Sequence, residues 1–310
     1  MKRYIISFII LTKIIFGCLW ISGTTIDGSY TNQNPRDDVQ LEILSRQIKV
    51  KPKQLIKNID NFSLIDDKSP KEEREAIVMI LKGDYSKAIE KLLECEKKYP
   101  NRYSVASNLG TAYELNGENK KALKWISEDL RRDPNSHYKT EWLHRYILKL
   151  KVEHKDISKY LKIHRVIELP KKFNNDTKIL VDKKYRTVKS IRGSIYYQLR
   201  ERVLFVKPKD PIVADLLYTL AIINANTSNL ENATKFLNLA KMYGFVDEKK
   251  LLDDKDRYNK IISTSKLSPM WHINYILDDP SRILLYILFL LIVLLIFKLF
   301  KNIAIFLKKR

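Results

Sequence analysis

A group of small and turn-forming residues recurs in this chain at a spacing of 34 residues. The recurring pairs are Gly83 and Gly117, Ala88 and Ala122, and Pro100 and Pro134. Glycine permits the left-handed backbone of a tight turn, and proline ends a helix. One period shared by three kinds of residue predicts paired helices that stack, because a single repeat cannot bury its apolar face alone.

The second copy of the repeat, residues 103–136, carries the fuller pattern. Its characteristic residues are Leu109, Gly110, Tyr113, Gly117, Ala122, Leu130 and Pro134. With these residues at these offsets, the sequence resembles the tetratricopeptide repeat family. Residues 69–102 resemble it less fully, because Ala76 and Met79 replace the Gly and the Tyr. The resemblance implies an all-α fold in which helical hairpins form a short α-solenoid.

The rest of the body is expected to extend or connect these hairpins. Apolar residues at helical spacing predict an amphipathic helix at Thr187–Val206. Asp210-Pro211 opens another helix and Asn229 marks a turn, which together indicate a divergent third repeat. The expected organisation is an N-terminal linker with short helices (24–68), two repeats and a following helix (69–155), a basic insert with a loop and the amphipathic helix (156–210), the third repeat (211–246) and a linker (247–282).

An apolar run near the C-terminus predicts a transmembrane helix at 283–300. Ile283–Phe297 contains no charge, and Leu299-Phe300 extend the run past Lys298. These positions span about 27 Å as a helix, which is near the hydrocarbon thickness of a bilayer. The tail at 301–310 is basic, and basic flanks stay in the cytoplasm. The pattern therefore places the tail inside and the body on the exported side of the cytoplasmic membrane.

The N-terminal residues 1–23 are typical of a secretory signal peptide. Basic Met1-Lys2-Arg3 precedes the apolar stretch Tyr4–Ile21, and small polar residues follow. We expect cleavage near Gly23. An uncleaved anchor and a lipoprotein signal that ends at Cys18 are the alternatives. Each reading agrees with an exported soluble domain, and cleavage gives the single-pass protein that we expect.

The net charge of +21 is concentrated in one part of the body. Residues 139–209 hold 20 Lys/Arg and 7 Asp/Glu. The candidate basic surface consists of Lys189, Arg192, Arg200 and Arg202. It is either a plain solvated surface or one that attracts acidic partners or the anionic membrane surface. Nucleic acid is not expected as a partner, because no aromatic residues punctuate the charges as a stacking platform.

The sequence contains no specific pattern for catalysis, for a cofactor or for a metal ion. It has no Gly-rich phosphate loop, no paired cysteines and no metal-binding helix motif. His144, His154 and His164 recur every ten residues, a spacing that does not place them on one helix face. Cys95 is expected to be a small buried apolar residue. We therefore expect a protein that is not an enzyme.

The family resemblance implies a concave groove lined by the first helix of each hairpin, where a partner's peptide or helix binds. The candidate groove residues are Glu73, Ile77, Ile80, Ser104, Ser107, Thr111, Glu114, Tyr138, Glu141 and Arg145. Chaperone-binding members clamp a carboxylate with Lys and Asn. Ser107 and Thr111 stand at those positions here, so this clamp is not expected. A mixed polar groove favours an extended segment, unless these residues only face solvent.

Two functions follow as hypotheses. The first is a protein–protein interaction scaffold of the bacterial cell envelope, held at the membrane by its C-terminal helix. The alternative is a binder of an acidic envelope polymer or of the anionic membrane surface through residues 139–209, with the repeats only structural.

Overall fold

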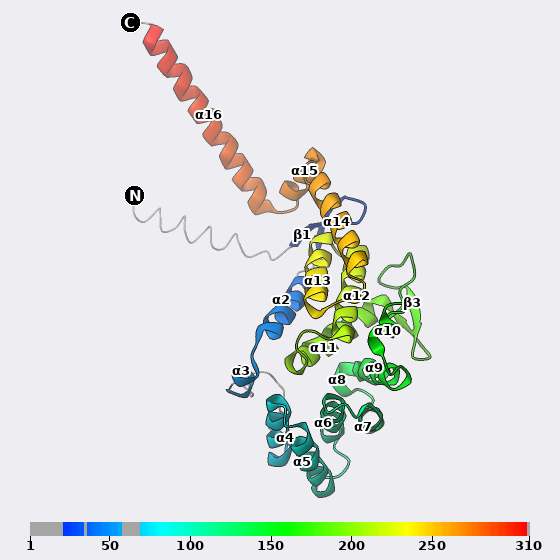
Figure 1. The fold of residues 1–310 in the computed structure, drawn as a ribbon. Helices are drawn as coiled ribbons and strands as arrows, with labels where there is room; N and C mark the ends of the chain where they lie inside the picture. Colours follow the sequence, from blue (N-terminus) through cyan, green and yellow to red (C-terminus); the bar gives the residue numbers. More distant parts are fainter. Residues whose placement is uncertain (1–20, 34–35, 58–68, 309–310) are drawn as a thin grey trace.

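The chain folds mainly into helices, as the sequence predicts. The structure is a computed structural model, and it describes residues 21–33, 36–57 and 69–308. Figure 1 shows an elongated body with α4–α7 at one end and α14–α15 at the other, from which α16 projects. The expectations for residues 1–20 lie outside the described residues. A solenoid of the tetratricopeptide type stays a prediction.

The repeat period corresponds to two consecutive helical hairpins. They consist of α4 (Lys71–Lys82) with α5 (Tyr85–Lys98), and α6 (Tyr103–Leu115) with α7 (Asn119–Arg132). The helices α5 and α7 begin 34 residues apart and also end 34 residues apart. Gly83 and Gly117 join the helices of each pair with φ of 86° and 82°. The two pairs share an apolar core that includes the buried thiol of Cys95, as predicted.

Gly110 lets α6 approach α7 more closely than any larger residue would allow. A Cβ atom at this position would lie 2.2 Å from Ile126 Cδ1 and 2.4 Å from its Cγ1. We expect Gly110→Ala to lower the free energy of unfolding by about 1–3 kcal/mol, because Ile126 is fully buried and must shift. Urea denaturation of the full chain in detergent, followed by circular dichroism, measures the change.

Gly193 provides the matched control for this substitution. It lies inside a helix, and a Cβ atom there meets nothing within 4 Å. Gly193→Ala is expected to raise the free energy of unfolding by about 0.5–1 kcal/mol, because alanine restricts the unfolded chain and favours the helix. Equal destabilisation by both substitutions would contradict the close packing assigned to Gly110.

The middle of the chain forms a second, larger core. It follows the short α8 (Ser136–Lys139), and its helices are α9 (Glu141–Glu153), α10 (Ile157–Leu161), α11 (Val188–Phe205), α12 (Pro211–Thr227) and α13 (Leu230–Tyr243). The amphipathic pattern predicted at Thr187–Val206 is helix α11, and α12 and α13 occupy the range expected for the third hairpin. The side chains of Thr187, Asp210 and Asn229 cap the first turns of α11, α12 and α13 by accepting backbone hydrogen bonds.

Two short β-hairpins correct the all-α prediction. The first joins β1 (Ile21–Thr24) to β2 (Tyr30–Gln33), and the second joins β3 (Lys178–Val181) to β4 (Lys184–Thr187). Both strand pairs are antiparallel. The second turn places Asp182 and Lys183 in the left-handed region, with φ of 46° and 62°. Each strand has only four residues, which is too short for a clear alternating pattern.

The first hairpin is an integral part of the fold. Thr24 is fully buried, and its backbone N–H and hydroxyl donate to the Glu231 carboxylate at 2.9 and 3.0 Å. A Cβ atom on Gly23 would lie 2.5 Å from Asn229 Cβ. Cleavage near Gly23 would therefore remove most of β1 from a packed position. The helices α2 (Arg36–Lys49) and α3 (Pro52–Lys57) follow, in the segment predicted to hold short helices.

The predicted linker at 247–282 is mostly helical. It consists of α14 (Glu248–Ser265) and α15 (Pro269–Leu277), and Leu251 and Tyr258 attach α14 to the core as fully buried residues. The apolar C-terminal run is part of α16 (Pro280–Lys308), so the expected tail continues this helix. Residues Pro280–Lys298 have a mean hydropathy of 2.6 and none of that window is buried. This helix is long and apolar enough to cross a membrane.

Candidate functional site

A cavity of about 1020 Å³ lies among α4, α6, α8, α9 and α11. It contains nine of the ten residues predicted for the groove, namely Glu73, Ile77, Ile80, Ser104, Ser107, Thr111, Glu114, Tyr138 and Glu141. Arg145 is not among the lining residues. Its guanidinium instead donates to Asp182 Oδ2 at 2.6 Å and ties α9 to the second β-hairpin.

The helix α11 forms a wall of the cavity that the family resemblance did not include. It contributes Tyr197, Gln198, Arg200, Glu201, Arg202, Leu204 and Phe205. The predicted basic surface is therefore divided. Arg200 lines the cavity and Arg202 is buried, whereas Lys189 and Arg192 lie outside the cavity near the start of the helix. Arg192 there donates to the Thr227 hydroxyl at 3.3 Å.

Glu114 joins this wall to the repeats. Its two carboxylate oxygens accept from the Arg202 guanidinium at 2.8 and 3.0 Å, and Lys151 Nζ donates at 2.6 Å. Burial alone would raise the pKa of Glu114, but the charges of Arg202 and Lys151 outweigh it and hold the pKa well below its usual range. Glu114 is thus a buried anion that three helices share.

A chain of hydrogen bonds connects Glu114 to Glu141 through His144. The imidazole lies 2.7 Å from Glu114 Oε2 through Nε2 and 2.8 Å from Glu141 Oε1 through Nδ1. Burial opposes the charged imidazole, but Glu141 and Glu114 raise the pKa of His144 to about 9. On the other side, Glu141 Oε2 is 2.6 Å from His137 Nδ1. These groups are largely paired with one another and form a rigid polar wall.

The backbone at the rim of the cavity has an unusual conformation. His137, Tyr138 and Lys139 have φ of 49°, 54° and 66°, in the left-handed region that non-glycine residues avoid. Such a conformation costs roughly 1–2 kcal/mol per residue. It presents Tyr138, which is 83% exposed, with its ring 5.3 Å from that of Tyr197. Strained backbone that presents an exposed aromatic ring is typical of a binding site.

The cavity is lined by polar groups and by charges of both signs, of which Ser107 and Glu73 are buried. The helix α6 contributes Ser104, Ser107, Asn108 and Thr111, which offer hydrogen-bond donors and acceptors. Acidic Glu73 comes from α4, and basic Lys139 and Arg200 come from α8 and α11. A ligand would therefore meet a mixed surface with an aromatic residue at its rim.

The sequence signal for the α11 wall was weak. Gln198 and Arg202 are polar residues one turn apart on the side of α11 that is otherwise apolar, and both are buried. This pattern indicates a buried polar contact but does not name its partner. Comparison with known proteins supplies no further guide, because no protein-family model and no curated protein matches the sequence.

Proposed function

We propose that this protein is a non-enzymatic scaffold of the tetratricopeptide type, which binds an extended segment of a partner protein in the cavity while α16 holds the complex at a membrane. The observation that carries the proposal is the cavity itself. It brings together nine predicted groove residues, among them the strained, exposed Tyr138. Tyrosine is among the residues that most often dominate the binding energy of protein interfaces.

The lining favours an extended peptide. An extended segment exposes backbone N–H and C=O groups at every residue, and Ser107, Asn108 and Thr111 can pair with them. The volume is at the upper end of the range of about 300–1,000 Å³ that small-molecule pockets occupy. Charges of both signs along the walls would select side chains of the segment, so the cavity can be specific without a large apolar surface.

The attachment to the membrane is supported by the residues next to α16. Three exposed apolar side chains, Met270, Ile273 and Leu277, recur at helical spacing and form a stripe along α15, and exposed Leu267 lies just before this helix. This stripe leads directly into α16 and would contact the membrane interface. The basic residues after the span favour a cytoplasmic end for α16 and an exported body. Figure 1 places α4 and α6 at the end of the body far from α16.

A tether of this kind makes a modest affinity sufficient. Two proteins held at one membrane meet at a high effective concentration, so a short peptide can remain bound without a large interface. The cavity, at the far end of the body, would reach a partner segment at some distance from the bilayer.

Peptide selection tests the proposal. A random-peptide library is selected on the full chain in detergent, and the peptides are then measured against single variants. We expect Tyr138→Ala to weaken binding by about 10-fold or more, since loss of an aromatic hot spot costs about 2 kcal/mol. Ser107→Arg, which fills the cavity from α6, should abolish it.

Tyr185→Ala is the matched control. Tyr185 is a comparably exposed tyrosine, at 72%, but it lies on β4 and does not line the cavity. Peptides that bind equally well to wild type, Tyr138→Ala and Ser107→Arg would contradict the proposal. Binding of an acidic polymer that is lost in Lys189→Gln and kept in Tyr138→Ala would support the alternative function instead.

A further inference from the structure

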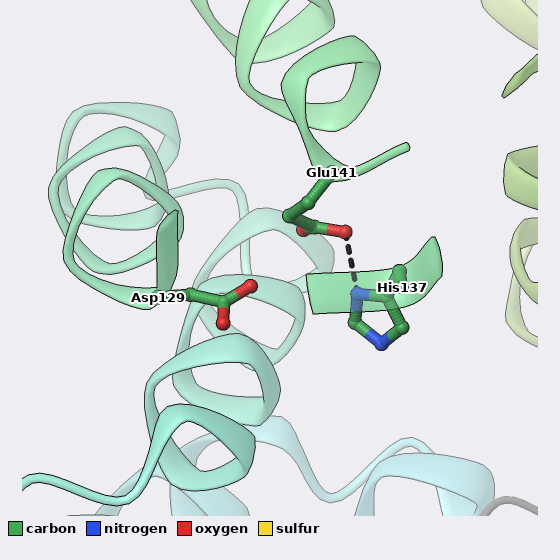
Figure 2. A group of neighbouring side chains, drawn as sticks. All are labelled: Asp129, His137 and Glu141. Atoms are coloured by element: carbon green, nitrogen blue, oxygen red, sulfur yellow. Dashed lines mark hydrogen bonds and ion pairs between the residues drawn. The ribbon is translucent and has the colours of Figure 1, made fainter. Parts of the chain in front are cut away.

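Three side chains that can bind a metal ion converge beside the cavity. They are Asp129 on α7, His137 on α8 and Glu141 on α9 (Figure 2). One ligand atom from each lies within 4.8 Å of the other two. His137 Nδ1 and Glu141 Oε2 are already 2.6 Å apart. The short segment between α7 and α9 therefore gathers one imidazole and two carboxylates in a single place.

Asp129 is the feature that points to a ligand. Asp129 is fully buried, and one of its carboxylate oxygens, Oδ2, accepts a hydrogen bond from the Ser136 hydroxyl at 3.0 Å. The other oxygen, Oδ1, is buried without a hydrogen-bond partner. Figure 2 shows this carboxylate directed toward the side of His137 and Glu141. A buried carboxylate oxygen without a partner is costly, and a bound cation would remove that cost.

Neighbouring groups hold the three side chains in orientation. Glu141 Oε1 pairs with His144 Nδ1 at 2.8 Å, which leaves Oε2 directed at His137. The Thr140 hydroxyl donates to the His137 carbonyl at 2.7 Å and supports the left-handed turn. Outer hydrogen bonds of this kind orient the ligands of metal sites.

The surrounding charges are compatible with a cation. Two positively charged residues lie nearby, His144 and Arg202, and both are hydrogen-bonded to Glu114. Glu201 adds a further carboxylate, 3.7 Å from His137 Nε2. A metal ion would therefore enter a region in which the nearby positive groups already have carboxylate partners.

We propose that Asp129, His137 and Glu141 bind a divalent transition-metal ion such as Zn²⁺. One imidazole nitrogen and two carboxylate oxygens suit zinc or manganese, and no thiolate is present to select a softer metal. Zinc ligands lie about 2.0–2.2 Å from the ion, so Asp129 must move slightly toward the other two. Binding replaces the His137–Glu141 hydrogen bond and releases its proton.

The site would keep one coordination position open toward the cavity. His137 and Glu141 line the cavity, whereas Asp129 lies behind them. A carboxylate or imidazole of a bound peptide would complete the coordination, and this extension rests on the proposed function. The metal site itself does not depend on it.

Metal titration tests the site without any peptide. The full chain, purified in detergent without a histidine tag and treated with a chelator, is titrated with zinc chloride at neutral pH by calorimetry. We expect one zinc ion per chain and a higher melting temperature. His137→Gln and Asp129→Asn should each weaken zinc binding by at least about 10-fold. Asp129→Asn keeps the shape of the side chain, and circular dichroism verifies that it folds.

His164→Gln is the matched control, because His164 is an exposed histidine that lies outside the cluster. It should leave zinc binding unchanged. The proposal is overturned if zinc does not bind, or if Asp129→Asn and His137→Gln bind it as wild type does. Peptide binding that persists while zinc binding fails would remove only the metal site and leave the proposed function intact.

Discussion

Glu114→Gln is expected to lower the free energy of unfolding by about 3–5 kcal/mol, the cost of breaking a buried ion pair from one side. The substitution keeps the size of the side chain but removes the charge that Arg202 and Lys151 share. Arg202 is only 8% exposed, so its charge would remain buried without an adequate partner. Urea denaturation of the full chain in detergent measures the change.

The matched control is Glu118→Gln, three residues after the same helix ends. Glu118 pairs with Lys121 and Asn116 on the surface and should leave stability unchanged. The double variant Glu114→Gln/Arg202→Met separates pairing from packing. Its loss of unfolding free energy should be smaller than the sum of the losses in the two single variants, because neither charge then remains unpaired. If the loss in the double variant equals the sum of the two single losses, Glu114 and Arg202 do not stabilise each other.

Much of the helical framework could be predicted because it depends on local signals. Gly83 and Gly117 fix two turns, and Asp210-Pro211 starts α12 with a capping side chain in the predicted place. The apolar run after Arg282 identifies α16 by composition alone. The candidate groove residues followed from register within the repeat, and nine of them line one cavity.

The remaining wall of the cavity could not be predicted, since it depends on contacts between distant parts of the chain. Arg202 and Glu114 are 88 residues apart, and an unmatched insert with a β-hairpin separates them. The sequence analysis grouped Arg202 with the candidate basic surface, and its position on the apolar side of α11 gave only a weak signal of burial. Only the packing of α11 beside α9 shows that it is buried. The β1–β2 hairpin was missed for a similar reason, because its stabilising partner, Glu231, is 207 residues away.

The cluster of Asp129, His137 and Glu141 was missed because of backbone conformation. Ligand motifs are recognised by helical spacing, and these residues are separated by a left-handed turn at His137–Lys139. Of the residue types His, Tyr and Lys, only His is enriched in that conformation, so three such residues in a row do not predict it. The histidine series at 144, 154 and 164 is defined by periodic spacing, and His137, the histidine of this cluster, does not belong to it.

The junction of the two hairpins provides the other large expected effect. Arg132 at the end of α7 is nearly buried, with its side chain 7% exposed, and donates to Glu96 of α5 at 2.7 and 2.8 Å. It also donates to the Arg102 carbonyl before α6 at 2.8 Å. Arg132→Ala should lower the free energy of unfolding by about 2–4 kcal/mol. This is less than the loss expected on breaking a fully buried ion pair, because Glu96 is partly exposed. Arg132→Lys should recover only part of this loss, since lysine cannot donate from a planar fork.

The neighbouring Arg131 provides the matched control for Arg132→Ala. Both arginines pair with Glu128, but the Arg131 side chain is 66% exposed, so Arg131→Ala should leave stability unchanged.

The dependence of stability on acid pH is a second measurement of the same contact. Hydrogen bonds from Arg131 and Arg132 lower the pKa of Glu128 from 4.5 to about 2. A lowered pKa stabilises the fold above the ordinary value, and this stabilisation is lost as pH falls from 4.5 toward 2. Wild type should therefore lose more stability than Arg132→Ala over that interval. Parallel acid profiles, or equal losses for Arg131→Ala and Arg132→Ala at neutral pH, would show that Arg132 does not hold the hairpins together.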